Sequence, residues 1–217
     1  MLSNRRPAAP QANPIPLPIQ TIADLRALYA APTERALKKQ LNALDVHCQR
    51  FIALSPFVVM STAGPTGALD ASPRGGAPGF IQVPDAHTLL IPDAPGNNRL
   101  DSLDNIIASG QIGLIFLIPG VDETLRVNGS AVLSTDPDDI ARCTDERRVP
   151  KLVIRVQVRD AYLHCAKALM RSRLWSPDSK IARSALPTSG EMLADHTGIH
   201  TPLETQAQMA ARYAPDL

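Results

Sequence analysis

The chain has 217 residues, of which 44% are hydrophobic and 20% are charged, so it can bury one core of ordinary size. Its 22 basic and 21 acidic residues leave a net charge of +1, so the protein has no strong overall positive potential to attract nucleic acid or an anionic membrane. The longest apolar run, around residues 113–121, is too short for a membrane helix, and three widely spaced cysteines exclude a disulfide scaffold.

The sequence also indicates the cellular compartment of the protein and the kind of partner that it binds. Residues 1–18 contain two arginines with no apolar segment after them, so we expect no secretory signal and a cytoplasmic protein. With 4% aromatic residues, the chain offers little surface for stacking the bases of single-stranded nucleic acid. We expect a small-molecule substrate, and neither nucleic acid nor a membrane as a partner.

The first part of the chain is rich in Pro, Ala, Asn and Gln without periodicity, which predicts an extended arm over residues 1–20. A short helix fits residues 22–30. From Thr33 to Leu54 apolar residues recur at helical spacing, which predicts one amphipathic helix with Thr33 as its N-cap. We therefore take residues 1–32 as an N-terminal arm outside the main domain.

Residues 57–165 predict a mainly β structure, because short apolar or alternating segments end at Gly and Pro turns. Gly129 interrupts its strand and predicts a bulge or bend. Since no βαβ alternation is present, the pattern favours an antiparallel barrel of six or seven strands with flanking helices. The expected strands are 57–64, 68–76, 80–83, 88–91, 111–118, 124–134 and 151–165, and the expected helices are 99–109 and 136–143.

The last part of the chain, from Ser176 on, shows weak periodicity. We expect a C-terminal tail over 179–217 that packs on the barrel or on a partner subunit. His196 and His200 stand four residues apart in the segment HTGIHTP, but Gly198 and Pro202 argue against a helix there and no third ligand stands nearby. We therefore expect no metal site, which would need three or four ligands.

Two segments combine a turn with a cation. In SPRGG, residues 72–76, glycines beside Arg74 let a ligand approach the backbone, and the guanidinium can fork onto a phosphate. A hairpin end with a solvated arginine is the alternative. In PGNNRLDSL, residues 95–103, a turn leads directly into a helix whose first amides, beside Asn98 and Arg99, suit a phosphate. The alternative is that Asn98 caps the helix.

Two further segments carry polar or cationic side chains. Arg126 and Asn128 share one face of a strand, which either points into a site or is an exposed surface. Between Lys151 and Arg183, basic residues far outnumber acidic ones, which suits an anionic small ligand or a solvated face. Trp175 follows this cluster and either stacks on a planar ligand or fills the core.

Familiar catalytic motifs are missing from the sequence. It contains no GxGxxG, GxxxxGK[ST], GxSxG or HExxH segment, so neither a dinucleotide fold, a P-loop, a hydrolase elbow nor a zinc protease is indicated. His164 and Cys165 cannot form a dyad, because adjacent strand residues point to opposite faces.

Taken in order, four stretches resemble the pyridoxamine 5′-phosphate oxidase-like family of FMN-binding split barrels, and most closely its bacterial subgroup of FMN-dependent enzymes. The stretches are FVVMSTAGPTGALDASPRGG, PGNNRLDSLDNI, ETLRVNGSAVLSTD and YLHCAKALMRSRLW. The resemblance spans residues 33–178 and implies a six-stranded antiparallel split β-barrel. It also implies a homodimer that binds FMN in clefts at the subunit interface.

The site residues that the resemblance implies for the flavin are Ser72, Arg74, Asn98, Arg99, Leu100, Arg126, Lys167, Arg171 and Trp175. Of these, the residues up to Leu100 would meet the flavin or hold its phosphate, Arg126 would reach the edge of the ring, and the last three would approach from the partner chain. The subgroup often has a second basic residue where this chain has Asn98, a departure that either weakens phosphate binding or is compensated by Arg74.

The function that the resemblance implies is an FMN-dependent oxidoreductase that transfers hydride at flavin N5. Pyridoxamine phosphate oxidases end in a segment of the form R-x-H-x-R, whereas this chain ends in RYAPDL, so we expect a different, unidentified substrate. The alternatives are a non-catalytic flavin- or haem-binding protein for storage or sensing, and a structural dimer with an empty cleft.

Overall fold

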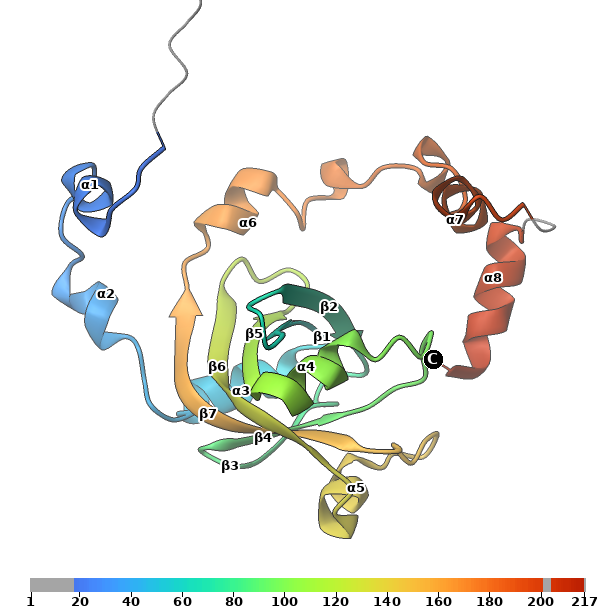
Figure 1. Ribbon diagram of the computed structural model, residues 1–217, viewed down its shortest axis with the longest axis horizontal. Coiled ribbons are helices and arrows are strands. Elements are labelled where there is room, and N and C mark those ends of the chain that lie inside the picture. Colours follow the sequence, from blue (N-terminus) through green and yellow to red (C-terminus); the bar gives the residue numbers. More distant parts are fainter. Residues whose placement is uncertain (1–17, 201–203, 217) are drawn as a thin grey trace, which may run out of the picture. The chain divides into compact units, whose positions relative to one another are not determined.

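The computed structural model describes residues 18–200 and 204–216 (Figure 1). The chain divides into two compact units, of which the first ends at Leu37 and the second begins at Lys38. The predicted extended arm falls largely on residues 1–17, outside the described residues. The division into residues 1–32, 33–178 and 179–217 stays a prediction.

The predicted single helix over residues 33–54 is wrong, because the chain forms two helices there. The first unit holds α1 (Ile22–Ala27) and most of α2 (Glu34–Lys38), and Thr33 caps α2 as expected by accepting a hydrogen bond from Ala36 N. Between α2 and α3 (Val46–Leu54), the backbone of Leu41 instead exchanges two 2.9 Å hydrogen bonds with Ala161. This pairing with a distant strand satisfies the backbone groups that a continuous helix would have used.

The second unit is built on one antiparallel sheet of seven strands in the order β2-β1-β5-β6-β7-β4-β3 (Figure 1). The antiparallel β fold with flanking helices is thus confirmed, with seven strands in place of the six that the resemblance implied. Each predicted strand is present within a few residues of its expected bounds. The strands are β1 (Phe57–Ala63), β2 (Leu69–Gly75), β3 (Gln82–Asp85), β4 (Thr88–Pro92), β5 (Gln111–Leu117), β6 (Thr124–Ser134) and β7 (Val153–His164).

The remaining helices of this unit lie between and after the strands. Helix α4 packs against β1, β2, β5 and β6 and buries Leu103 and Ile106 in the core, while α3 packs on β6 and β7 and buries Cys48 and Ile52. The short α5 packs on β4 and β7. The helices are α4 (Asp101–Ser109), α5 (Pro137–Cys143), α6 (Lys167–Ser172), α7 (Ser189–Thr197) and α8 (Gln206–Tyr213), with short 3-10 turns at Pro177–Ser179, Arg183–Ala185 and Ala214–Asp216.

The two faces of the sheet differ, as the alternation of side chains along a strand requires. The inner face carries apolar residues that are almost completely buried, among them Met60, Leu114 and Val127. Their neighbours along the strands, such as Val59, Ile115 and Arg126, point to the outer face and are half-buried or exposed. Every residue on these strands is therefore assigned to one face by the cross-strand register.

The bulge predicted at Gly129 is present. The register between β6 and β7 shifts between Asn128 and Gly129. A Cβ atom at Gly129 would overlap the carbonyl oxygen of Gln157, so no larger residue fits without moving the strands apart. Glycine at this position permits the close approach of the two backbones.

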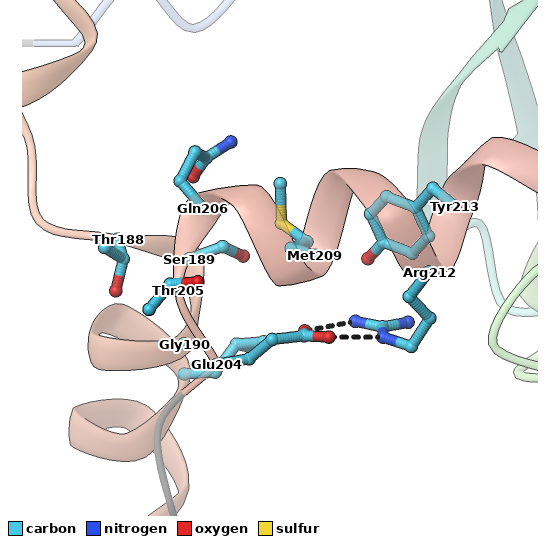
Figure 2. A pocket seen from close by; sticks show the side chains of 10 residues that line it. Thr188, Ser189, Gly190, Glu204, Thr205, Gln206, Met209, Arg212 and Tyr213 are labelled. Atoms are coloured by element: carbon cyan, nitrogen blue, oxygen red, sulfur yellow. Dashed lines mark hydrogen bonds and ion pairs between the residues drawn. The ribbon is translucent and has the colours of Figure 1, made fainter.

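Two helices near the C-terminus line a small, partly open pocket of about 50 Å³ (Figure 2). Each helix begins with a capping box, set by Thr188 for α7 and by Thr205 for α8. Arg212 of α8 makes a two-pronged ion pair with Glu204, at 3.0 and 2.8 Å. As expected, Gly198 keeps His196 and His200 from sharing one helix, although His196 itself lies in the last turn of α7, which ends at Thr197.

Candidate functional site

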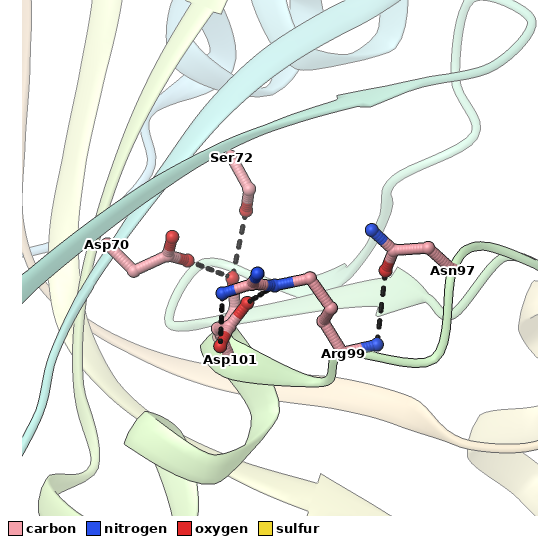
Figure 3. Close-up of polar contacts among 6 residues, drawn as sticks. Asp70, Ser72, Asn97, Arg99 and Asp101 are labelled. Carbon is pink, nitrogen blue, oxygen red and sulfur yellow. Dashed lines mark hydrogen bonds and ion pairs between the residues drawn. The ribbon is translucent and has the colours of Figure 1, made fainter. Parts of the chain in front are cut away.

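The two segments that combine a turn with a cation come together in the structure, at β2 and the start of α4 (Figure 3). Ser72 Oγ on β2 lies 2.9 Å from Ser102 Oγ in the first turn of α4. Ser102 Oγ in turn donates a 2.5 Å hydrogen bond to Asp70 Oδ2. These contacts fix the start of α4 against β2, and we take this junction as the candidate site.

Strand alternation decides which β2 residues face the junction. Asp70, Ser72 and Arg74 alternate with exposed neighbours, and each is half-buried. Ser72 pairs in register with Met60, whose side chain lies in the core, so these three residues share the inner side of the sheet.

The start of α4 has an unusual backbone. Asn98 and Leu100 both adopt left-handed conformations, with φ of 59° and 61°, and Leu100 occupies the N-cap position without a side-chain hydrogen bond. The alternative that Asn98 caps the helix is therefore wrong. A helix N-terminus without a side-chain cap presents backbone N–H groups and a partial positive charge.

Arg99 is exposed and its guanidinium is turned toward its own helix (Figure 3). It donates to Asp101 at 2.8 and 3.4 Å, while its backbone N–H donates to Asn97 Oδ1 at 3.1 Å. The hydrogen bond from Arg99 lowers the pKa of the Asp101 carboxyl. A ligand phosphate at this position would have to compete with Asp101 for the guanidinium.

Arg74 differs from Arg99 because it is half-buried and poorly partnered. Burial lowers the pKa of its guanidinium, and the opposite charges of Asp93 and Asp70 act against that shift. Within residues 18–200 and 204–216, its guanidinium makes a single hydrogen bond, to the carbonyl oxygen of Pro73 at 2.9 Å. Since an arginine has five N–H donors, Arg74 has donor capacity left for an anion.

Arg126 lies on the other face of the sheet. Cross-strand register places it beside Ile115, which lies beside Val59, which lies beside Pro73. Arg126 therefore shares its face with Pro73, whereas Ser72 and Arg74 point the opposite way. Its guanidinium lies 5.1 Å from the centre of the Tyr162 ring, a cation–π contact across β6 and β7.

The neighbours of Arg126 were partly missed by the sequence analysis. Asn128, on the same face, donates a 2.7 Å hydrogen bond to Asp160. Lys39 also lies over the Tyr162 ring, at 5.4 Å, and donates to the carbonyl oxygen of Leu163. The break in the predicted helix over residues 33–54 puts Lys39 beside β7, and no sequence pattern showed that break.

The last three predicted residues lie on α6 and just after it. Arg171 donates to the Lys167 carbonyl oxygen at 3.0 Å, and the half-buried Trp175 donates from Nε1 to the Val121 carbonyl oxygen at 2.9 Å. Among the described residues, no hydrogen bond or ion pair joins them to β2 or to the start of α4. The structure therefore brings Ser72 together with Arg74 and the residues that begin α4, and leaves Arg126, Lys167, Arg171 and Trp175 elsewhere.

Two of the three cysteines, Cys48 and Cys143, lie in surroundings that disfavour the reactive thiolate. Burial raises the pKa of the Cys48 thiol to about 12 and that of Cys143 to about 11, so both stay protonated and poorly nucleophilic at neutral pH. Residues 18–200 and 204–216 hold no group of three or more His, Cys, Asp or Glu placed to bind a metal ion. No helix in those ranges has the length and apolar character needed to span a bilayer.

Asp70 and Ser102 are site residues that the sequence analysis missed. The signal for Asp70 was present, because D-x-S-x-R places Asp70 on the same strand face as Ser72 and Arg74. Ser102 is the buried polar residue in the first turn of an otherwise amphipathic helix. A polar side chain buried there needs a partner, which Asp70 supplies.

Comparison with known proteins gives one match to a protein family. The family model described as pyridoxamine 5′-phosphate oxidase matches residues 44–165, which include β2, α4 and Arg126. No curated protein matches the chain significantly.

Several solved structures are similar to part of the chain. HupZ from Group A Streptococcus is 16% identical, covering 55% of this chain and 92% of its own, with a TM-score of 0.46. An FMN-binding protein from Syntrophomonas wolfei is 11% identical over 53% of this chain and 81% of its own, with a TM-score of 0.42. An FAD binding protein from Mycobacterium smegmatis is 15% identical over 57% of this chain and 97% of its own, with a TM-score of 0.41.

Proposed function

Because this chain belongs to the pyridoxamine 5′-phosphate oxidase family, we propose that it is an FMN-dependent oxidoreductase acting on a small molecule. The observation that carries the proposal is the junction of β2 with α4. There β2 carries a half-buried arginine, Arg74, whose guanidinium makes one hydrogen bond among the described residues. The same strand contacts the first turn of α4, whose N-terminus has no side-chain cap among those residues.

The residues at this junction fit a phosphate monoester. Arg74 supplies a cation held in a partly desolvated position, where its attraction for an anion is stronger than at the surface. The first N–H groups of α4 and the positive end of the helix supply donors without a competing cap. Arg99 supplies a second cation once it leaves Asp101. These residues would bind the FMN phosphate.

A homodimer accounts for the split of the predicted residues between two sheet faces. A ligand at the junction meets the inner side of β2, so Arg126 of the same chain faces away from it. Arg126 of a second copy of the chain can face that ligand, because its direction is not fixed by the sheet to which the ligand binds. The same face carries the exposed apolar side chains Ile115 and Phe57, 39% and 38% exposed, and their burial would favour association.

Bound FMN would supply hydride transfer at N5 of its ring. In the proposed dimer, the guanidinium of Arg126 or the ammonium of Lys167, each from the partner copy, would stabilise negative charge near the ring. The chain would position the substrate and exclude water. No side chain has to act as a strong acid or base. No R-x-H-x-R segment occurs in the 217 residues, so we propose a substrate other than pyridoxamine phosphate.

Anaerobic mixing of the FMN-loaded protein with NADH, NADPH or dithionite tests the redox proposal. We expect dithionite and one of the nicotinamides to bleach the yellow colour, with the loaded Arg142→Ala variant as a control that leaves the site intact. Flavin that only dithionite bleaches would count against a reductase that works with nicotinamide alone. Flavin that not even dithionite bleaches would refute redox function.

A further inference from the structure

The hydrogen bonds among Asp70, Ser102 and Ser72 have a fixed direction. Ser102 Oγ donates to Asp70 Oδ2 at 2.5 Å, and its side chain is buried, with the residue only 4% exposed. A serine hydroxyl carries a single hydrogen. Ser102 can therefore only accept in its 2.9 Å contact with Ser72 Oγ, and Ser72 is the donor.

This direction determines what Ser72 can offer to a ligand. Its hydrogen is used on Ser102, so the remaining capacity of Ser72 Oγ is to accept. Ser72 is half-buried on the strand face that also carries Arg74, at the junction where the phosphate is proposed to bind (Figure 3). An ionised phosphate offers acceptor oxygens, so a direct contact with Ser72 would place two acceptors against each other.

We propose that Ser72 accepts a hydrogen bond from a hydroxyl of the ligand's polyol chain, and that Asp70 and Ser102 are positioning residues that set this polarity. The inference rests on the proposed function, since FMN carries both a phosphate and a polyol chain. It assigns separate tasks within one site. Arg74 and the backbone amides of α4 bind the phosphate. The hydrogen-bonded series Asp70, Ser102 and Ser72 binds a neutral hydroxyl of the ligand beside it.

Riboflavin and FMN together distinguish the two possible roles of Ser72, because they share the polyol chain and only FMN has the phosphate. The measurement is the dissociation constant of each flavin, from quenching of its fluorescence, for the wild-type protein and for Ser72→Ala. We expect Ser72→Ala to weaken both flavins by the same factor, about three- to tenfold for one neutral hydrogen bond. Ser130→Ala, at an exposed serine on β6, serves as the matched control and should change neither constant.

The outcomes that overturn the proposal are specific. If Ser72→Ala weakens FMN alone, Ser72 donates to the phosphate. If it weakens neither flavin, Ser72 does not touch the ligand. If folded wild-type protein binds neither FMN nor riboflavin, the proposed function itself fails, and this inference fails with it. Those results are separable because only the last concerns the wild-type protein.

Ser102→Ala tests the positioning role without changing the charge of the site. Removal of the acceptor releases the hydrogen of Ser72, which can then turn toward the phosphate. We expect riboflavin to weaken more than FMN, so that the ratio of the two constants shifts at least about threefold toward FMN, and Ser102→Thr to restore the wild-type ratio. A purely structural role would weaken both flavins alike. An unchanged ratio in a folded Ser102→Ala protein would therefore overturn the positioning role.

Discussion

Two arginines with the same predicted role differ in their surroundings. The sequence placed Arg74 and Arg99 beside turns and predicted a phosphate for both. In the structure Arg99 is exposed and paired with Asp101, whereas Arg74 is half-buried and donates only to a backbone oxygen among the described residues. A half-buried cation with unused donors gains more from an anionic ligand than an exposed and paired one does.

Replacement of Arg74 tests this difference. Arg74→Ala is expected to weaken FMN by about tenfold or more, the effect of losing a hydrogen bond to a charged group, while riboflavin changes little. Arg74→Lys should retain part of the affinity, because lysine keeps the charge and loses the forked geometry. Titration of flavin fluorescence measures both constants.

The control for Arg74 is Arg142→Ala, at an exposed arginine near the end of α5. It removes the same charge far along the chain and should leave both flavins unaffected. An Arg74→Ala protein that is folded and binds FMN as tightly as the wild type would contradict the assignment of Arg74 to the phosphate.

At the scale of elements, local sequence patterns predicted the positions of the strands well. They failed to predict the structure where pairing between distant parts of the chain determines it. The strands that follow alternation, and the bulge at Gly129, agree with the expected positions. The helix over residues 33–54 fails because Leu41 pairs with Ala161, a contact across the chain that no local pattern contains. The resemblance put Ser72, Arg74 and the residues that begin α4 in one flavin site, but the hydrogen bonds through Asp70 and Ser102 that join β2 to α4 were not foreseen. The face of Arg126 follows from register with three other strands.

The bulge makes Gly129 the most constrained glycine of the sheet. Gly129→Ala would drive a methyl group into the Gln157 carbonyl oxygen, so β6 and β7 must separate. We expect a loss of about 3 kcal/mol in the free energy of unfolding, measured by urea denaturation. Gly96→Ala meets no atom within 4 Å and should have almost no effect, and equal stabilities of the two variants would contradict the account of the bulge.

The cap of α3 gives a prediction that depends on pH. Asp45 Oδ1 accepts a 2.8 Å hydrogen bond from Cys48 N, and that bond lowers the pKa of the Asp45 carboxyl. The stabilisation is therefore complete above the ordinary pKa of 3.8 and is lost as the pH falls through the lowered value in the folded protein.

Asp45→Ala should cost about 1 kcal/mol of unfolding free energy at pH 7, typical for loss of an N-cap. The difference between wild type and variant should shrink as the pH falls below 3.8. Asp45→Asn keeps a capping oxygen and should lose little at either pH. A cost of Asp45→Ala that is the same at pH 7 and in acid would show that the carboxylate is not the stabilising form.

At the scale of the whole molecule, the proposed flavin site is built from two copies of the chain. In an isologous dimer each copy gives Arg74 to one site and Arg126 to the other. Chains carrying Arg74→Ala or Arg126→Ala alone should both bind FMN weakly as homodimers. Co-expression of the two variants should produce heterodimers with one intact site, and hence tight binding that neither variant shows alone. If the co-expressed variants bind FMN no more tightly than either variant alone, Arg74 of one copy and Arg126 of the other do not contribute to the same site.

The central claim is that this chain holds FMN, and the visible absorbance spectrum of the purified protein tests it most directly. We expect a yellow protein with the spectrum of a bound flavin, from which heat releases a molecule with the mass of FMN in amounts equimolar to the chain. The claim would be contradicted if the folded protein is colourless and if FMN added to it keeps the absorbance spectrum and fluorescence of free flavin.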